Sequence, residues 1–233
     1  MEKIIARQLI KKTDTSEIMG YELLVQSDAE SLYNSSVDSA AANAMTAFLT
    51  ENSSKIFRDR KTFMTFTPML LFRNTPKIFD KDMIMIQIED NVVIHPLASI
   101  LIEKYREEGY HFAINDFQFI PKYFSMLEYV DYIKVKVTGE EEDRERRSLE
   151  NVVEMAHGFG KEVIATSINT KEAFLLAKEI HTDYVEGAYI SDTSVSKVGK
   201  MEYLQGNLYQ LIMEVTKDEP DMEVMEQIVT RDA

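Results

Sequence analysis

Residues 83–116, MIMIQIEDNVVIHPLASILIEKYREEGYHFAIND, contain one strand–helix–strand unit. MIMIQI (83–88) is nearly all apolar, which is typical of a strand buried on both faces of a sheet. HPLASILIEKYREEG (95–109) has a proline near its start and a glycine at its end, the asymmetry expected of a helix. The apolar run YHFAI (110–114) then predicts a second strand. A unit of this kind favours a parallel sheet.

Similar units extend the pattern toward both ends of the chain. Further strands are predicted at TFMTF (62–66), DYIKVKV (131–137), KEVIAT (161–166) and DYVEGAYI (183–190). Helical patterns separate them, including NTKEAFLLAKEI (169–180) and the charged segment that ends near HGFG. At this number of repeats within 233 residues, an α/β barrel is the favoured architecture.

The two ends of the chain depart from this repeat. IIARQLI (4–10) and IMGYELLVQ (18–26) flank the turn-like KKTDTSE, which predicts an antiparallel hairpin, and residues 36–57 have helical spacing. From Met201 the pattern changes to two helical segments broken by KDEPD. We therefore expect a barrel domain at residues 1–200 and, at residues 201–233, a linker helix and the start of a truncated helical domain.

Composition excludes several classes of partner. The net charge is −14 with a pI near 4.8, a field that repels nucleic-acid backbones and anionic lipids. There is no cysteine for a disulfide, a thiolate metal site or a nucleophile. The N-terminal apolar run is too short for a signal peptide, and no later run has membrane-spanning length, so we expect a cytoplasmic protein.

Polar residues recur where the predicted strands end, and in a parallel barrel that edge carries the functional groups. They are Glu22, Thr65, Gln87, Asn115, Asp116, Lys134, Thr166, Asn169 and Glu186. Their order, beginning with GYELLVQ and continuing through FMTF, IQIED, AINDF, YIKVK and VEGAY, resembles the motifs of EAL domains, the cyclic di-guanylate phosphodiesterases, from about residue 3 to 195. The resemblance implies a modified TIM-type (β/α)8 barrel whose first strand is antiparallel, followed here by C-terminal helices.

The resemblance also implies a site in which acidic residues and one asparagine hold two divalent cations, Mg²⁺ or Mn²⁺, that activate water. At the matched positions Glu22, Asp116 and Lys134 are retained. The other positions are substituted: Gln26 replaces an arginine that grips phosphate, Thr65 an asparagine, Gln87 a glutamate, Asn115 an aspartate, Lys136 an aspartate, Thr166 and Asn169 two glutamates, and Glu186 a glutamine.

Amides and hydroxyls keep much of the size of the replaced side chains but delete the charge that metal binding uses. We therefore expect no functional catalytic residues, no metal and no cofactor; any metal that did bind would use Glu22 and Asp116. We expect Lys134 to form an ion pair with one or both of these acids. The amide at Gln26 cannot supply a bidentate grip on phosphate, which argues against binding of cyclic di-guanylate.

The sequence thus predicts a catalytically inactive EAL-like domain of bacterial-type signal transduction that acts as a regulatory or protein-interaction module. Two alternatives stay open. One is a metal-dependent phosphodiesterase with an altered site that uses Mg²⁺ or Mn²⁺, with Glu89 and Asp90 as its candidate ligands. The other is a nucleotide receptor without turnover. The tail resembles the linker helix and first helix of an HDOD domain, as in EAL-HDOD proteins. The protein partner is not identified, and the resemblance allows a homodimer.

Overall fold

Eight strands form the wall of the protein. The computed structural model describes residues 3–27, 60–66, 68–72, 74–118, 120–191, 194–198, 211, 214–215, 217 and 220–230. The strands that form the wall are β1 (Lys3–Lys12), β2 (Ile18–Ser27), β3 (Lys61–Thr65), β4 (Ile84–Ile88), β5 (His111–Ile114), β6 (Tyr132–Lys136), β7 (Glu162–Thr166) and β8 (Tyr184–Glu186). Strands β2 to β8 are parallel neighbours in chain order.

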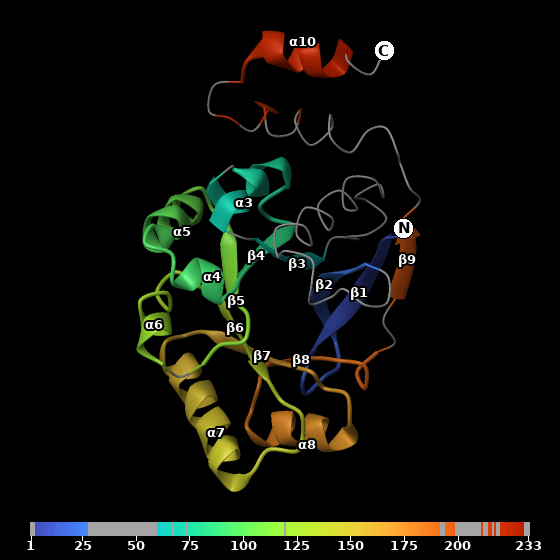
Figure 1. Ribbon diagram of the computed structural model, residues 1–233. Helices are drawn as coiled ribbons and strands as arrows, with labels where there is room; N and C mark the ends of the chain where they lie inside the picture. The colour runs from blue at the N-terminus through green and yellow to red at the C-terminus, as the bar shows by residue number, and fades with distance from the viewer. Residues whose placement is uncertain are drawn as a thin grey trace.

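Strand β1 closes the sheet into a barrel (Figure 1). It pairs antiparallel with β2 along its length, from Lys3 opposite Ser27 to Lys11 opposite Ile18, and its last residues pair antiparallel with β8. This arrangement confirms the predicted hairpin and the predicted barrel with an antiparallel first strand. Strand β9 (Ser194–Val198), which pairs with the first half of β1, was not predicted from the sequence.

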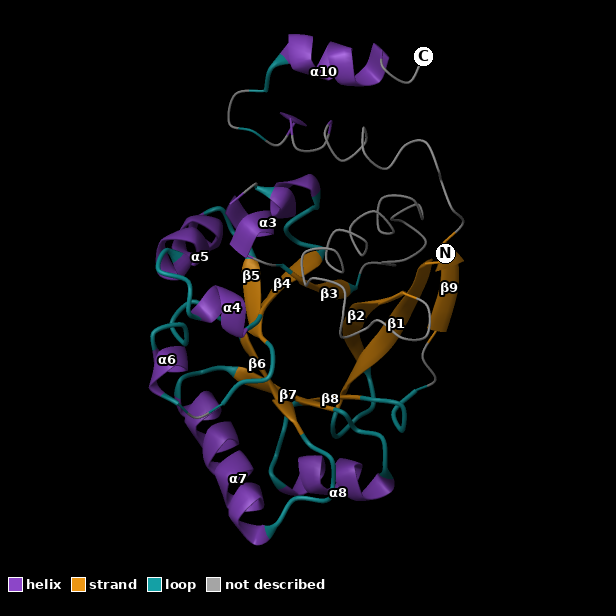
Figure 2. Ribbon diagram, in the orientation of Figure 1, coloured by secondary structure: helices purple, strands orange, loops and turns teal. Residues whose placement is uncertain are grey.

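Helices lie outside the barrel, most of them along its wall and the last one apart from it (Figure 2). Those that the structure describes are α3 (Pro68–Phe72), the 3-10 helix η1 (Thr75–Ile78), α4 (Asp90–Val93), α5 (Ala98–Glu107), α6 (Pro121–Phe124), α7 (Asp143–Gly158), α8 (Lys171–Glu179) and α10 (Met222–Thr230). Helix α5 begins three residues later than predicted, with Leu97 as its N-cap. The helix predicted over residues 36–57 lies outside the described residues, as does most of the first helical segment of the tail. In the part of the chain that the structure describes, no helix is long and apolar enough to cross a membrane.

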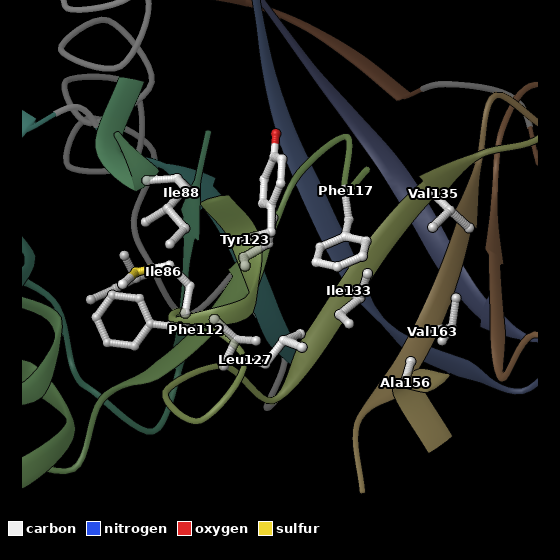
Figure 3. Packing of buried hydrophobic residues seen from close by; sticks show 14 of the residues in the cluster. Ile86, Ile88, Phe112, Phe117, Tyr123, Leu127, Ile133, Val135, Ala156 and Val163 are labelled. Atoms are coloured by element: carbon white, nitrogen blue, oxygen red, sulfur yellow. The ribbon is translucent and has the colours of Figure 1, made fainter. Parts of the chain in front are cut away.

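The apolar side chains of the strands form two layers, because successive residues point to opposite faces of the sheet. One set points outward and packs beneath the helices, as Ile86, Phe112, Ile133 and Val163 do (Figure 3). The intervening side chains point into the barrel, and there Ile10, Phe63, Met85, Ala113, Tyr132, Ile164 and Tyr184 form a buried inner layer. Burial on both faces explains why these strands read as continuous apolar runs.

Candidate functional site

The candidate site lies directly above this inner apolar layer. Because side chains alternate along a strand, the residue two positions after an inward apolar residue also faces inward. Phe63, Met85, Tyr132 and Tyr184 are followed in this way by polar residues at the C-terminal ends of their strands. Those polar residues, with their counterparts on the other strands, are Glu22, Thr65, Gln87, Asn115, Lys134, Thr166 and Glu186.

Lys134 occupies the centre of this polar layer. Its ammonium Nζ lies 2.8 Å from Glu22 Oε2 and 2.9 Å from Glu186 Oε2, and the Lys134 side chain is only 1% exposed. The same nitrogen donates a hydrogen bond of 3.1 Å to Gln87 Oε1 and lies 5.8 Å from the centre of the Phe63 ring. One cation is therefore bound by groups from four other strands.

Gln87 completes the network. Its amide Nε2 donates to Glu22 Oε1 at 2.8 Å and to Thr65 Oγ1 at 3.0 Å. Each oxygen of Glu22 thus accepts a hydrogen bond, one from an amide and one from the ammonium of Lys134. Since a buried charge is tolerated when it is paired and hydrogen-bonded, this network accounts for three ionisable groups inside the barrel.

The pKa values follow from this arrangement. Burial alone would raise the pKa of Glu22, but the Lys134 ammonium and hydrogen bonds from Glu186, Lys134 and Gln87 lower it to about 2. Burial opposes the charge of Lys134, yet the carboxyls of Glu186 and Glu22 outweigh it and raise the pKa of the ammonium. Burial and the neighbouring Glu22 carboxylate raise the pKa of Glu186 well above its ordinary value, although Lys134 acts in the opposite direction. Glu22 and Lys134 are therefore the charged pair, and Glu186 is the carboxyl that retains its proton most readily.

One of the two predicted partners of Lys134 is confirmed. The pair with Glu22 is confirmed, but the second carboxyl is Glu186 instead of Asp116. Asp116 is exposed, has a left-handed backbone with φ of 48°, and forms no ion pair with a described residue. Asp116 follows the last residue facing the barrel, Asn115, and its backbone turns away from the strand there.

The remaining substituted positions lie around the rim. Thr166 Oγ1 donates to the carbonyl of Val135 at 3.3 Å, and Asn169 Oδ1 accepts from the backbone N–H of Ala188 at 3.1 Å. Thr166 thus links β7 to β6, Asn169 links the loops after β7 and β8, and neither contributes to the Lys134 network. Lys136 is exposed at the end of β6. Gln26 lies in β2 opposite Ile4, and its side chain is outside what the structure describes.

Two acids after β4 have different roles. Glu89 is half-buried, and burial raises the pKa of its carboxyl, with Asp116 and Glu22 adding to the effect and a hydrogen bond from Asn115 opposing it. Asp90 accepts hydrogen bonds from Lys122 and from the Tyr123 hydroxyl on α6. Asp90 therefore fixes α6 to the start of α4, a contact that the sequence reasoning missed because it joins residues 32 and 33 positions apart.

Comparison with known proteins agrees with this geometry. The sequence matches the EAL domain over residues 8–193. The chain belongs to the EAL domain family. Its barrel superposes on the EAL domain of Mycobacterium smegmatis DcpA with a TM-score of 0.66 at 15% identity, covering 82% of this chain and 92% of that one.

Two curated relatives are longer than this chain. YuxH of Bacillus subtilis is 24% identical over 242 aligned residues, which cover 100% of this chain and 57% of YuxH. The cyclic di-GMP phosphodiesterase CdgJ of Vibrio cholerae is 21% identical and is matched over 98% of this chain and 53% of its own length. The chain therefore spans about half the length of these EAL relatives.

Proposed function

We propose that this EAL domain is catalytically inactive and acts in signal transduction as a regulatory or protein-interaction module. The observation that carries the proposal is the neutral amide of Gln87, which stands where the resemblance implies a glutamate and donates to Glu22 at 2.8 Å and to Thr65, another substituted position, at 3.0 Å. The retained Lys134 lies 2.8 Å from Glu22, so the acid left in this network is already paired with a cation. Membership of a family that includes a cyclic di-GMP phosphodiesterase supplies the signalling context.

Two divalent cations do not fit this set of donors. Metal pairs that hydrolyse phosphodiesters need several carboxylate oxygens, which hard cations prefer. Both oxygens of Glu22 are already hydrogen-bonded, Glu186 retains a proton readily, and the Lys134 ammonium repels a second cation nearby. Among the residues that the structure describes, no group of three or more His, Cys, Asp or Glu side chains is placed to hold a metal ion.

Hydrolysis of cyclic di-guanylate tests the proposal. We expect the purified chain with Mg²⁺ or Mn²⁺ to hydrolyse no more substrate than its Glu22→Gln variant, which keeps the size and hydrogen bonding of the side chain. Turnover that exceeds this variant and stops when the metal is chelated would contradict the proposal. Circular dichroism of both proteins shows whether the variant is folded.

A phosphodiesterase with an altered metal site is the second candidate. It is favoured by Glu89, a half-buried carboxyl that senses the charges of Asp116 and Glu22 at the barrel mouth. If Mn²⁺ bound there, Glu89→Gln would abolish both Mn²⁺ binding and hydrolysis, whereas Asp90→Asn would affect mainly the contact with α6. Calorimetric titration with Mn²⁺ distinguishes these outcomes.

Ligand binding without turnover is the remaining alternative. The solved structure of the EAL enzyme Bd1971, which is similar to this chain with a TM-score of 0.63, has cAMP and cyclic-di-GMP bound, and this motivates a binding test with the dinucleotide. Our expectation that the present chain does not bind cyclic di-guanylate stays a prediction. Heat released on titration with the dinucleotide in the absence of metal would favour the receptor.

A further inference from the structure

Helices α3, α4 and α5 lie near one another on one side of the barrel (Figure 1), and exposed apolar side chains lie on or beside all three. We call Phe72, Ile94, Leu97 and Ile100 the α4–α5 patch. Their exposed fractions are 44%, 63%, 45% and 63%, and Pro96 between them is also exposed. Single exposed apolar residues are ordinary, but a group of this kind marks an interaction site.

The patch is held in a defined shape. The rings of Phe72 and His95 meet edge to face with centroids 5.1 Å apart, which ties the end of α3 to the link between α4 and α5. His95 Nδ1 accepts the backbone N–H of Leu97 at 3.2 Å. Ile94 is the C-cap of α4 and Leu97 the N-cap of α5, so both lie at fixed helix ends. A preorganised surface loses little conformational entropy when a partner binds.

Acidic residues continue this face along α5. Glu103 and Glu107 lie three and seven residues after Ile100, which places all three on one side of the helix, and both acids are exposed. Lys104 is only half-exposed, and Arg106 is paired with Asp131 at 2.7 Å. Lys104, four residues after Ile100, is on the same side of the helix, so among the described residues of α5 two exposed acids and one half-exposed lysine border the patch and the net charge there is negative.

We infer that the α4–α5 patch binds an amphipathic helix of a partner protein whose apolar stripe is bordered by Lys or Arg. Apolar contact with the patch would supply affinity, and pairing with Glu103 and Glu107 would orient the helix. A second copy of this chain fits less well, because it would bring the same acids and another net charge of −14. An anionic membrane is disfavoured for the same reason. The inference rests on the proposed role as an interaction module and names its partner.

The test uses two synthetic helices of about 18 residues, or five turns. Both carry one leucine stripe; Lys borders the stripe in the first and Glu in the second. Fluorescence anisotropy of labelled peptide measures binding to the whole chain. We expect the Lys-bordered peptide to bind about tenfold or more tightly than the Glu-bordered one.

Variants locate the binding. The double variant Ile94→Ser, Ile100→Ser should bind the Lys-bordered peptide about tenfold or more weakly than the wild type does. Phe159, at the C-cap of α7, and Leu175, on α8, have similar exposure. The double variant Phe159→Ser, Leu175→Ser should leave the affinity for this peptide unchanged. Glu103→Lys with Glu107→Lys should reverse the preference to the Glu-bordered peptide. The pair Glu150→Lys and Glu154→Lys on α7 changes net charge equally and should not reverse it.

Four results would overturn the inference. Equal loss in the Phe159 and Leu175 variant would show that binding is not confined to the patch, and equal reversal in the α7 variant would show that only net charge matters. If the wild type is a dimer and the Ile94 and Ile100 variant is a monomer, the patch binds a second copy of this chain. Cosedimentation with phosphatidylglycerol vesicles, lost in the same variant, would make the membrane the occupant. These binding readouts are independent of the hydrolysis assay, so either proposal can fail alone.

Discussion

A single lysine determines how the barrel interior tolerates charge. Lys134 pairs with Glu22 and Glu186, and all three groups are buried. Removing one member of a buried ionic cluster leaves the others without compensation, which costs more than the cluster contributes. The cluster is thus a sensitive point of the fold.

Lys134→Met should lower the free energy of unfolding by about 3–5 kcal/mol, because the Glu22 carboxylate would remain buried without its cation. Urea denaturation measures the change. The triple variant Glu22→Gln, Lys134→Met, Glu186→Gln removes every charge and should recover most of the loss. A Lys134→Met protein as stable as the wild type would contradict the view that the ammonium compensates the acids.

Glu186→Gln should change how stability depends on pH. The raised pKa of Glu186 means that the folded protein keeps a proton that the unfolded chain releases above its ordinary pKa of about 4.3. Wild-type stability should therefore fall as pH rises from that value toward the folded pKa, by up to about 1.4 kcal/mol per pH unit. The glutamine has no proton to release, so its stability relative to wild type should increase over this range. Urea denaturation between about pH 5 and pH 8 tests the sign; a difference that is constant or decreases would contradict it.

Among the elements, the strands were the most predictable and the site contacts the least. Residues 62–66 and 83–88 are apolar because both of their faces are buried, and β3 and β4 were found there. Lys134 with Glu22 could be predicted because opposite charges stood at matched strand ends. Glu186 was recognised as a position, but its contact with Lys134 depends on the two side chains meeting across β7, which lies between β6 and β8, and no local pattern encodes that reach.

The turn after β8 depends on Gly187. A Cβ at this position would lie 2.2 Å from the carbonyl oxygen of Ile168, so the β7–α8 loop approaches the backbone too closely for any side chain. Gly187→Ala should lower the free energy of unfolding by about 1–3 kcal/mol. Gly158→Ala is the matched control, because nothing lies within 4 Å of the added Cβ at the end of α7. Thermal unfolding of both variants is the measurement, and equal midpoints would contradict the close approach.

At the scale of the whole molecule, the charges inside the EAL barrel compensate one another without a metal. The resemblance implies acids at positions 87 and 115, but Gln87 and Asn115 are neutral amides. Lys134, in the middle of β6, therefore faces only Glu22 and Glu186 within the network, which joins five strands of the barrel wall, β2, β3, β4, β6 and β8. Stability should then depend on the chain alone.

Divalent cations should therefore leave the thermal unfolding midpoint unchanged. A ligand present at 100 times its Kd stabilises the folded state by about 2.7 kcal/mol, which raises Tm by about 5–11 °C for a chain of this size. We expect no such rise for the wild type in millimolar Mg²⁺ or Mn²⁺. Lys134→Met, in which Glu22 and Glu186 lose their cation, should gain stability with Mn²⁺ because the ion can compensate the two carboxyls. A saturable rise in the wild type that Glu22→Gln abolishes would mean that metal competes successfully with the ammonium, and the inactive reading of the site would fail with it.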